Sequence, residues 1–385
     1  MRRVVAILFI SALGPVLFAQ GTFPLAWQDV PGYPGSTLLA EDRMVNAVDY
    51  DRAAPKAEST GLRRFRVPVG GREVLVGFLG SERSTIYVDT EGNLGKLTPL
   101  QSQTPISGAR FFDFGPVGIA GAAKGTTVRV RLRVYEDRVA VRAAGYRSGH
   151  VRLDGKDYLV AVADGDLDGR FDGTFTLAHL ADKVYDRLAI DLNGDGRFDW
   201  NVTSCEVQPL PRIVQIGGAW WSVKVAPDGS TIEFARAEPP MGSIDVGTSE
   251  AELVLWSENG ACRLSGAPGR WPVPAGQYTT VEVRALRADA AGGIWSMTSR
   301  ETPALAAFEV RTSQTFSTRL GAPFVARPDI FKTMNAQAIN FAIFGQGGEK
   351  YSPNMSLNGK PQEPPQLRIA SASGQILESG KFALG

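Results

Sequence analysis

Two short acidic segments carry the residues whose types and spacing most clearly suggest chemistry. Residues 164–172 read DGDLDGRFD and residues 191–199 read DLNGDGRFD, so Asp, Gly, Arg and Phe recur at matching positions. Side-chain oxygens at alternating positions of a tight loop converge on one point, and calcium takes six to eight oxygen ligands. The two segments, called loop one and loop two below, are therefore predicted to bind Ca²⁺.

The loop register names the candidate ligands. Positions one, three, five and nine offer side-chain oxygens, and position seven offers a backbone carbonyl. In loop one the candidates are Asp164, Asp166, Asp168, Arg170 and Asp172. In loop two they are Asp191, Asn193, Asp195, Arg197 and Asp199. Acidic turns also form without a metal, but the four crowded carboxylates of loop one repel one another and favour a cation.

Both segments resemble the calcium loop of EF-hand, dockerin and thrombospondin type 3 repeats, over about ten residues each. At position twelve, where an EF-hand has a bidentate Glu, this chain has Phe175 and Val202, which carry no side-chain oxygen. The last ligand is then missing or comes from elsewhere, and affinity is expected near the 10⁻⁴ to 10⁻³ M of extracellular modules. Three acidic residues lie close enough in the sequence to lend the missing oxygen, but each is expected to be a surface charge. They are Asp182, Asp186 and Glu206.

The segments around the loops read as strands. Gly (43) and Pro (24) are abundant, and the apolar runs between them are short, β-branched and alternating, as half-buried strands require. Residues 158–162 and 188–190 are predicted strands that lead into the loops, where an EF-hand has helices. Residues 128–134 (VRVRLRV) place Arg129, Arg131 and Arg133 on one strand face, which we expect to be solvated. The predicted fold class is all-β, with several β-sandwich or barrel-like modules and little helix.

The chain of 385 residues is longer than one hydrophobic core usually organises. Residues 1–19, a basic head followed by an apolar run, read as a signal peptide. Pro- and Gly-rich stretches suggest boundaries near residues 240 and 320. We therefore expect a β region over residues 20–240 with both loops, a β module over 241–320 and a β segment over 321–385. Residues 271–278 (WPVPAGQY) resemble a strand entry of transthyretin-like modules, which implies a transthyretin- or Ig-like fold for the middle module.

Charge, cysteine content and hydropathy limit the cellular locations and the classes of partner that the sequence favours. Removal of residues 1–19 would leave 39 basic against 40 acidic residues, a balance that does not favour nucleic acid. No further apolar stretch is long enough to span a membrane. The chain is expected to be secreted, periplasmic or at the cell surface, where Cys205 and Cys262 could form a disulfide or stay as two buried thiols.

The remaining sequence gives little sign of catalysis. His150 and His179 have no metal-ligand spacing around them, and GxSxG does not occur. The favoured hypothesis is a non-enzymatic surface, matrix or binding component with structural Ca²⁺ and a protein or glycan partner. The alternative is a secreted hydrolase acting on polysaccharide and stabilised by calcium. A pocket flanked by two carboxylates outside the loops would favour the hydrolase.

Overall fold

The computed structural model describes residues 21–30, 43–46, 62–79, 82–91, 97–102, 111–122, 125–135, 138–180, 185–199, 201–247, 250–266, 269–332, 337–363 and 366–381. The expected signal peptide, residues 1–19, lies outside them. The described chain is almost wholly β-strand, which confirms the predicted fold class. Its helices are short 3₁₀ turns, η2 (Leu177–Leu180), η3 (Val202–Ser204) and η4 (Pro303–Leu305). None of the helices described is long and apolar enough to cross a bilayer.

The first sandwich packs two antiparallel sheets on one core that includes Phe65, Phe78 and Phe114. One sheet has the strand order β3-β10-β9-β8 and the other β4-β5-β6-β7. The strands are β3 (Arg43–Asn46), β4 (Leu62–Val69), β5 (Arg72–Leu79), β6 (Glu82–Val88), β7 (Thr98–Gln101), β8 (Phe112–Ala120), β9 (Thr127–Val134) and β10 (Arg138–Ala143).

The second sandwich packs around Trp221, Phe234 and Val160. Its sheets have the orders β1-β17-β16-β15 and β14-β13-β12-β11-β2. The strands are β1 (Gly21–Pro24), β2 (Ala26–Asp29), β11 (Gly145–Leu153), β12 (Lys156–Ala163), β13 (Arg187–Ile190), β14 (Val207–Pro209), β15 (Ile213–Ile216), β16 (Ala219–Val225) and β17 (Thr231–Arg236). The predicted strands 158–162 and 188–190 are β12 and β13, so strands do lead into both loops.

The third core, around Leu253, Tyr278 and Tyr351, lies between a three-stranded sheet and a large sheet that continues to β30. The three-stranded sheet contains β18 (Met241–Asp245), β21 (Arg270–Pro274) and β25 (Thr315–Ser317). The large sheet contains β19 (Ala251–Ser257), β20 (Gly260–Gly266), β22 (Gly276–Ala288), β23 (Ile294–Glu301), β24 (Phe308–Val310), β26 (Val325–Lys332), β27 (Gln337–Phe344), β28 (Lys350–Tyr351), β29 (Ser356–Leu357) and β30 (Lys360–Pro361). A separate hairpin pairs β31 (Gln366–Ala370) with β32 (Ile376–Lys381).

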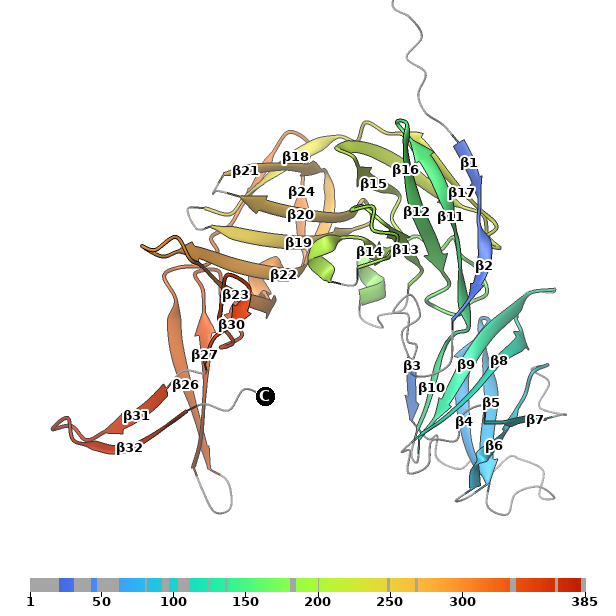
Figure 1. The fold of residues 1–385 in the computed structure, drawn as a ribbon, viewed down its shortest axis with the longest axis horizontal. Helices are drawn as coiled ribbons and strands as arrows, with labels where there is room; N and C mark the ends of the chain where they lie inside the picture. Colours follow the sequence, from blue (N-terminus) through green and yellow to red (C-terminus); the bar gives the residue numbers. More distant parts are fainter. Residues whose placement is uncertain are drawn as a thin grey trace, which may run out of the picture.

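The three sandwiches follow one another along an arch, with β4 to β10 at one end and β26 to β32 at the other (Figure 1). Backbone hydrogen bonds join the first sandwich to the second, as from Ala144 N–H to the Arg129 carbonyl at 2.8 Å. The second is joined to the third from Arg212 N–H to the Glu258 carbonyl, also at 2.8 Å. The second sandwich is therefore in direct contact with both of its neighbours.

The arginine face of β9 is only partly solvated, because Arg129 is exposed while Arg131 and Arg133 are shielded, so that expectation was wrong for two of the three arginines. Arg131 is only 9% exposed, and its guanidinium donates to the Val30 carbonyl at 2.8 Å and to the Gly115 carbonyl at 3.0 Å. Arg133 forms a 2.8 Å ion pair with Asp113. Buried charges are tolerated when hydrogen-bonded and paired, and the chain segment after β2 supplies a partner that is distant in the sequence.

Candidate metal centre

Both loops begin at the carboxyl end of a strand in the same sheet. Loop one follows β12 and loop two follows β13, and these two strands are antiparallel neighbours. The antiparallel pairing puts the end of β12 beside the start of β13, because Ala163 pairs with Arg187. Loop one therefore lies beside the residue that precedes β13, which is Asp186.

In loop one the carboxylates hold the backbone in a tight turn. Asp164 accepts the N–H groups of Asp168 (3.1 Å) and Gly169 (2.9 Å) through its two oxygens. Asp166 Oδ1 accepts the Asp168 N–H at 3.0 Å, and Asp168 Oδ1 accepts the Arg170 N–H at 2.7 Å. Gly169 has a φ of +88°, a conformation that a Cβ would disfavour. With these bonds in place, the side chains at loop positions one, three and five face one centre.

Loop two repeats the arrangement. Asp191 accepts the N–H groups of Asp195 (3.2 Å) and Gly196 (2.8 Å). Asn193 Oδ1 accepts the Asp195 N–H at 2.8 Å and Asp195 Oδ1 accepts the Arg197 N–H at 2.9 Å. The side-chain oxygens at positions one, three and five thus accept the corresponding backbone N–H groups in both loops. Loop two is more open, since Asn193, Asp195, Arg197 and Asp199 are all exposed.

The three leading carboxylates of loop one form a cluster of metal-binding dimensions. One oxygen from each of Asp164, Asp166 and Asp168 lies within 4.8 Å of the others. Carboxylates this close repel one another when all of them are ionised, and this set of oxygen donors fits a hard cation such as Ca²⁺ or Mg²⁺.

The electrostatics of loop one also favour a bound cation. Burial, and then the charge of Asp166, raise the pKa of Asp164 well above its usual value of 3.8. The same two causes raise the pKa of Asp168. A bound cation would offset both causes, because it replaces the lost hydration and neutralises the repulsion.

Sequence reasoning misjudged two acidic residues that organise the loops. Asp186 and Glu206, expected at the surface, are 1% and 2% exposed. Asp186 accepts the N–H groups of Gly165 (3.2 Å) and Gly173 (2.8 Å), near the two ends of loop one. Burial and the charge of Asp164 raise the pKa of Asp186 well above 3.8. The placement of Asp182 is outside the described residues.

Glu206 does for loop two what Asp186 does for loop one. Its Oε1 accepts the N–H groups of Leu192 and Asn193, both at 3.2 Å, and its Oε2 accepts the Asp199 N–H at 2.8 Å. Each of these acidic residues stands directly before the strand that follows its loop, β13 or β14. That repeated position is the sequence signal that could have identified them.

The remaining predicted positions have other contacts. Both oxygens of Asp172 accept hydrogen bonds from the Arg170 guanidinium, at 3.0 and 2.7 Å. Asp199 Oδ1 accepts the Asn201 N–H at 2.9 Å. Phe175, at position twelve of loop one, is fully buried and packs edge-on against Tyr185 and Trp256, so this position anchors the loop by apolar contact.

Loop one also joins two sandwiches. Leu167 lies in the core of the first sandwich and Phe171 in the core of the second. The Gly70 N–H donates to the Leu167 carbonyl at 2.5 Å, and Leu167 holds a φ of +60°, which is unusual for a residue with a branched side chain. A cavity of about 350 Å³ between the β4–β5 turn and the loop is lined by Asp166 and Asp168 together with Arg72 and Glu73.

The cysteines are free in this structure. Cys205 and Cys262 are both buried, and burial raises their pKa values to about 11 and about 12. Both thiols therefore stay protonated at neutral pH, which makes them poor nucleophiles and metal ligands.

Comparison of the chain with protein-family models, with curated proteins and with solved structures found no match. The metal-binding geometry of loop one is therefore the main guide to what the protein does.

Proposed function

We propose that the chain is an exported calcium-binding β protein in which loop one holds a structural Ca²⁺ at the junction of two sandwiches. The convergence of Asp164, Asp166 and Asp168 carries this proposal. These three side chains, with the carbonyl of Arg170, would hold the ion, and water would complete the shell. Calcium suits such a site better than magnesium, which demands a strict octahedron and keeps its waters.

The proposed role is mechanical. An ion in loop one would fix the short segment between Leu167 and Phe171, whose side chains lie in different cores. Loop two, with Asn193 in place of one carboxylate and most of its residues exposed, would bind calcium more weakly. Export is supported by residues 1–19, which have the order of a signal peptide.

A surface, matrix or binding component fits better than a hydrolase. Two cavities formed by described residues, of about 780 and 600 Å³, are each lined by a single carboxylate, Glu250 or Glu282. A glycosidase generally needs two carboxylates that face one sugar. The arrangement favours binding of a partner over its hydrolysis.

Calcium titration calorimetry on residues 20–385 tests the proposal. The unsubstituted chain should bind at least one Ca²⁺, and Asp168→Ala should abolish the tightest site, because it removes one of three converging carboxylates. Asp195→Ala should remove only a weaker site. Asp157→Ala, at a surface position, is the control and should leave the titration unchanged. Binding heat that Asp168→Ala does not alter would contradict a site in loop one.

A further inference from the structure

A polar cleft of about 600 Å³ lies between the end of loop two and the large sheet of the third sandwich. Its lining includes Asn201, Glu282 and Arg284 of β22, and Arg300 of β23. The residues that line it are Asn201, Glu282, Arg284, Thr298, Arg300, Phe341, Ala342, Lys350, Tyr351, Ser352 and Pro353. Concave sites with a few convergent polar groups are a common form of small-ligand site.

Glu282 is an acidic residue of the cleft whose side chain is buried. It is 5% exposed, and its carboxylate lies 3.8 Å from Arg284 and 3.5 Å from Arg300. Neither contact has hydrogen-bond geometry, so among the described residues the carboxylate accepts no hydrogen bond. The carboxylate is thus held by two ion pairs and can still accept a hydrogen bond from a ligand hydroxyl in the cleft.

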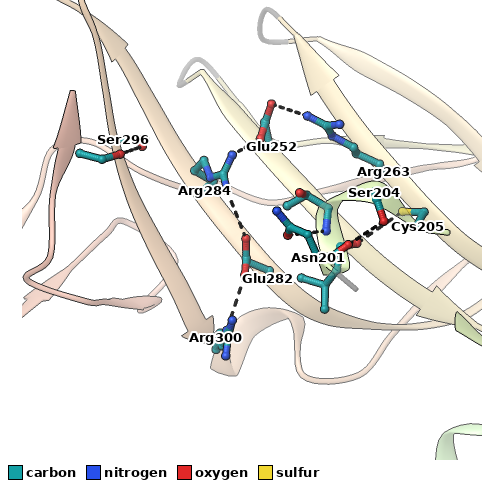
Figure 2. Close-up of polar contacts among 12 residues, drawn as sticks. Asn201, Ser204, Cys205, Glu252, Arg263, Glu282, Arg284, Ser296 and Arg300 are labelled. Atoms are coloured by element: carbon teal, nitrogen blue, oxygen red, sulfur yellow. Dashed lines mark hydrogen bonds and ion pairs between the residues drawn. The ribbon is translucent and has the colours of Figure 1, made fainter. Parts of the chain in front are cut away.

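The two arginines are held differently. Arg284 donates to Glu252 at 3.1 Å, and Glu252 is also paired with Arg263 at 3.1 Å. Figure 2 shows the resulting row of alternating charges, which runs from Arg263 through Glu252, Arg284 and Glu282 to Arg300. Arg300 ends the row with its side chain 77% exposed. Its guanidinium can therefore receive an anion without breaking the network behind it.

The charge of the lining favours an acidic ligand. Arg284, Arg300 and Lys350 are basic, and Glu282 is the acidic residue among the lining residues named above. Guanidinium groups bind carboxylates through two parallel hydrogen bonds. Thr298 and Ser352 add hydroxyl groups, and Phe341 adds an aromatic side chain.

The segment just after loop two supplies one more donor. The Asn201 N–H donates to Asp199 Oδ1 at 2.9 Å, and Asn201 Oδ1 accepts the Thr203 N–H at 3.2 Å. These bonds fix the side-chain amide at the amino end of η3, beside Glu282 and Arg300 (Figure 2). Its NH₂ group makes no hydrogen bond to the described residues and can donate to a ligand.

We propose that this cleft binds an acidic saccharide, a sugar chain that carries uronic-acid carboxylates. Arg300 pairs with a ligand carboxylate, Glu282 accepts a ring hydroxyl, and Asn201 donates to a second oxygen. This combination of a buried carboxylate, an exposed guanidinium and an amide recognises a molecule with both carboxylates and hydroxyls. The assignment is independent of an ion in loop one.

Titration of the calcium-saturated chain with galacturonic acid trisaccharide tests this inference. The unsubstituted chain should bind the trisaccharide, and its methyl ester should bind at least about tenfold more weakly, because charge-assisted hydrogen bonds to Arg300 are lost. Arg300→Gln should cause a loss of similar size. Arg311→Gln is the matched control, because Arg311 is also mostly exposed and forms one ion pair, with Glu309, away from the cleft.

Two results would overturn the assignment. One is the absence of trisaccharide binding to a chain that still binds calcium, which separates this inference from the proposed calcium site. The other is equal affinity of the Arg300→Gln and Arg311→Gln variants, which would place the sugar elsewhere. Equal melting temperatures of these two variants would confirm that Arg300→Gln leaves the fold intact.

Discussion

Excess chelator should lower the free energy of unfolding of the calcium-saturated chain by about 2.7 kcal/mol, if free Ca²⁺ had stood at about 100 times Kd. The physical reason is that the ion binds the folded loop and has no comparable site in the unfolded chain. The buried, mutually repelling carboxylates of Asp164 and Asp168 then lose their counter-charge. Denaturant unfolding with and without chelator measures the change.

Two variants make this prediction specific. Asp168→Ala should respond little to chelator, because its strongest site is already gone. Asp195→Ala, with the equivalent substitution in loop two, should keep most of the response. An unsubstituted chain that unfolds at the same denaturant concentration in calcium and in chelator would show that the ion contributes nothing to the fold.

Asp186→Ala is expected to destabilise the calcium-bound chain by about 2–4 kcal/mol, the largest effect we expect from one substitution near the loops. The change leaves the N–H groups of Gly165 and Gly173 without their acceptor, and an unsatisfied buried donor costs about 1–3 kcal/mol. In chelator the loss should be smaller, because removal of Asp186 also relieves its repulsion with Asp164. Chemical denaturation in both buffers measures the two values.

A control for the Asp186→Ala variant lies on β12, the strand beside β13. Asp157 lies in β12, and its side chain is 66% exposed and 3.9 Å from Arg152. Surface substitutions of this kind usually change stability by less than about 0.5 kcal/mol. If Asp186→Ala were as mild as Asp157→Ala, Asp186 would have no part in holding loop one.

The loop register could be predicted from the sequence because it depends on local spacing. Alternating oxygens and a glycine at position six define the turn within a few residues, and in both loops the carboxylate at position one accepts the N–H of that glycine. Hairpin turns are equally local. The Asp228–Gly229, Asn259–Gly260 and Asn358–Gly359 pairs each join two antiparallel strands.

What depended on tertiary pairing could not be predicted. Asp186 reaches loop one only because β13 runs antiparallel beside β12. Arg131 is buried because the chain after β2 covers one side of β9 and supplies the Val30 carbonyl. Alternation within a strand shows which side chains share a face, but what covers that face is determined by distant segments. The cleft around Glu282 combines Asn201, just after loop two, with residues of the large sheet, and for the same reason no sequence pattern indicated it.

A crystal of the chain grown with calcium gives the most direct test of the central claim. The account predicts an anomalous scattering peak between the carboxylates of Asp164, Asp166 and Asp168, with metal–oxygen distances of about 2.3–2.6 Å. Loss of this peak in Asp168→Ala crystals would support the assignment further. Carboxylates that turn away from one another in calcium-grown crystals, with no peak at their centre, would contradict it.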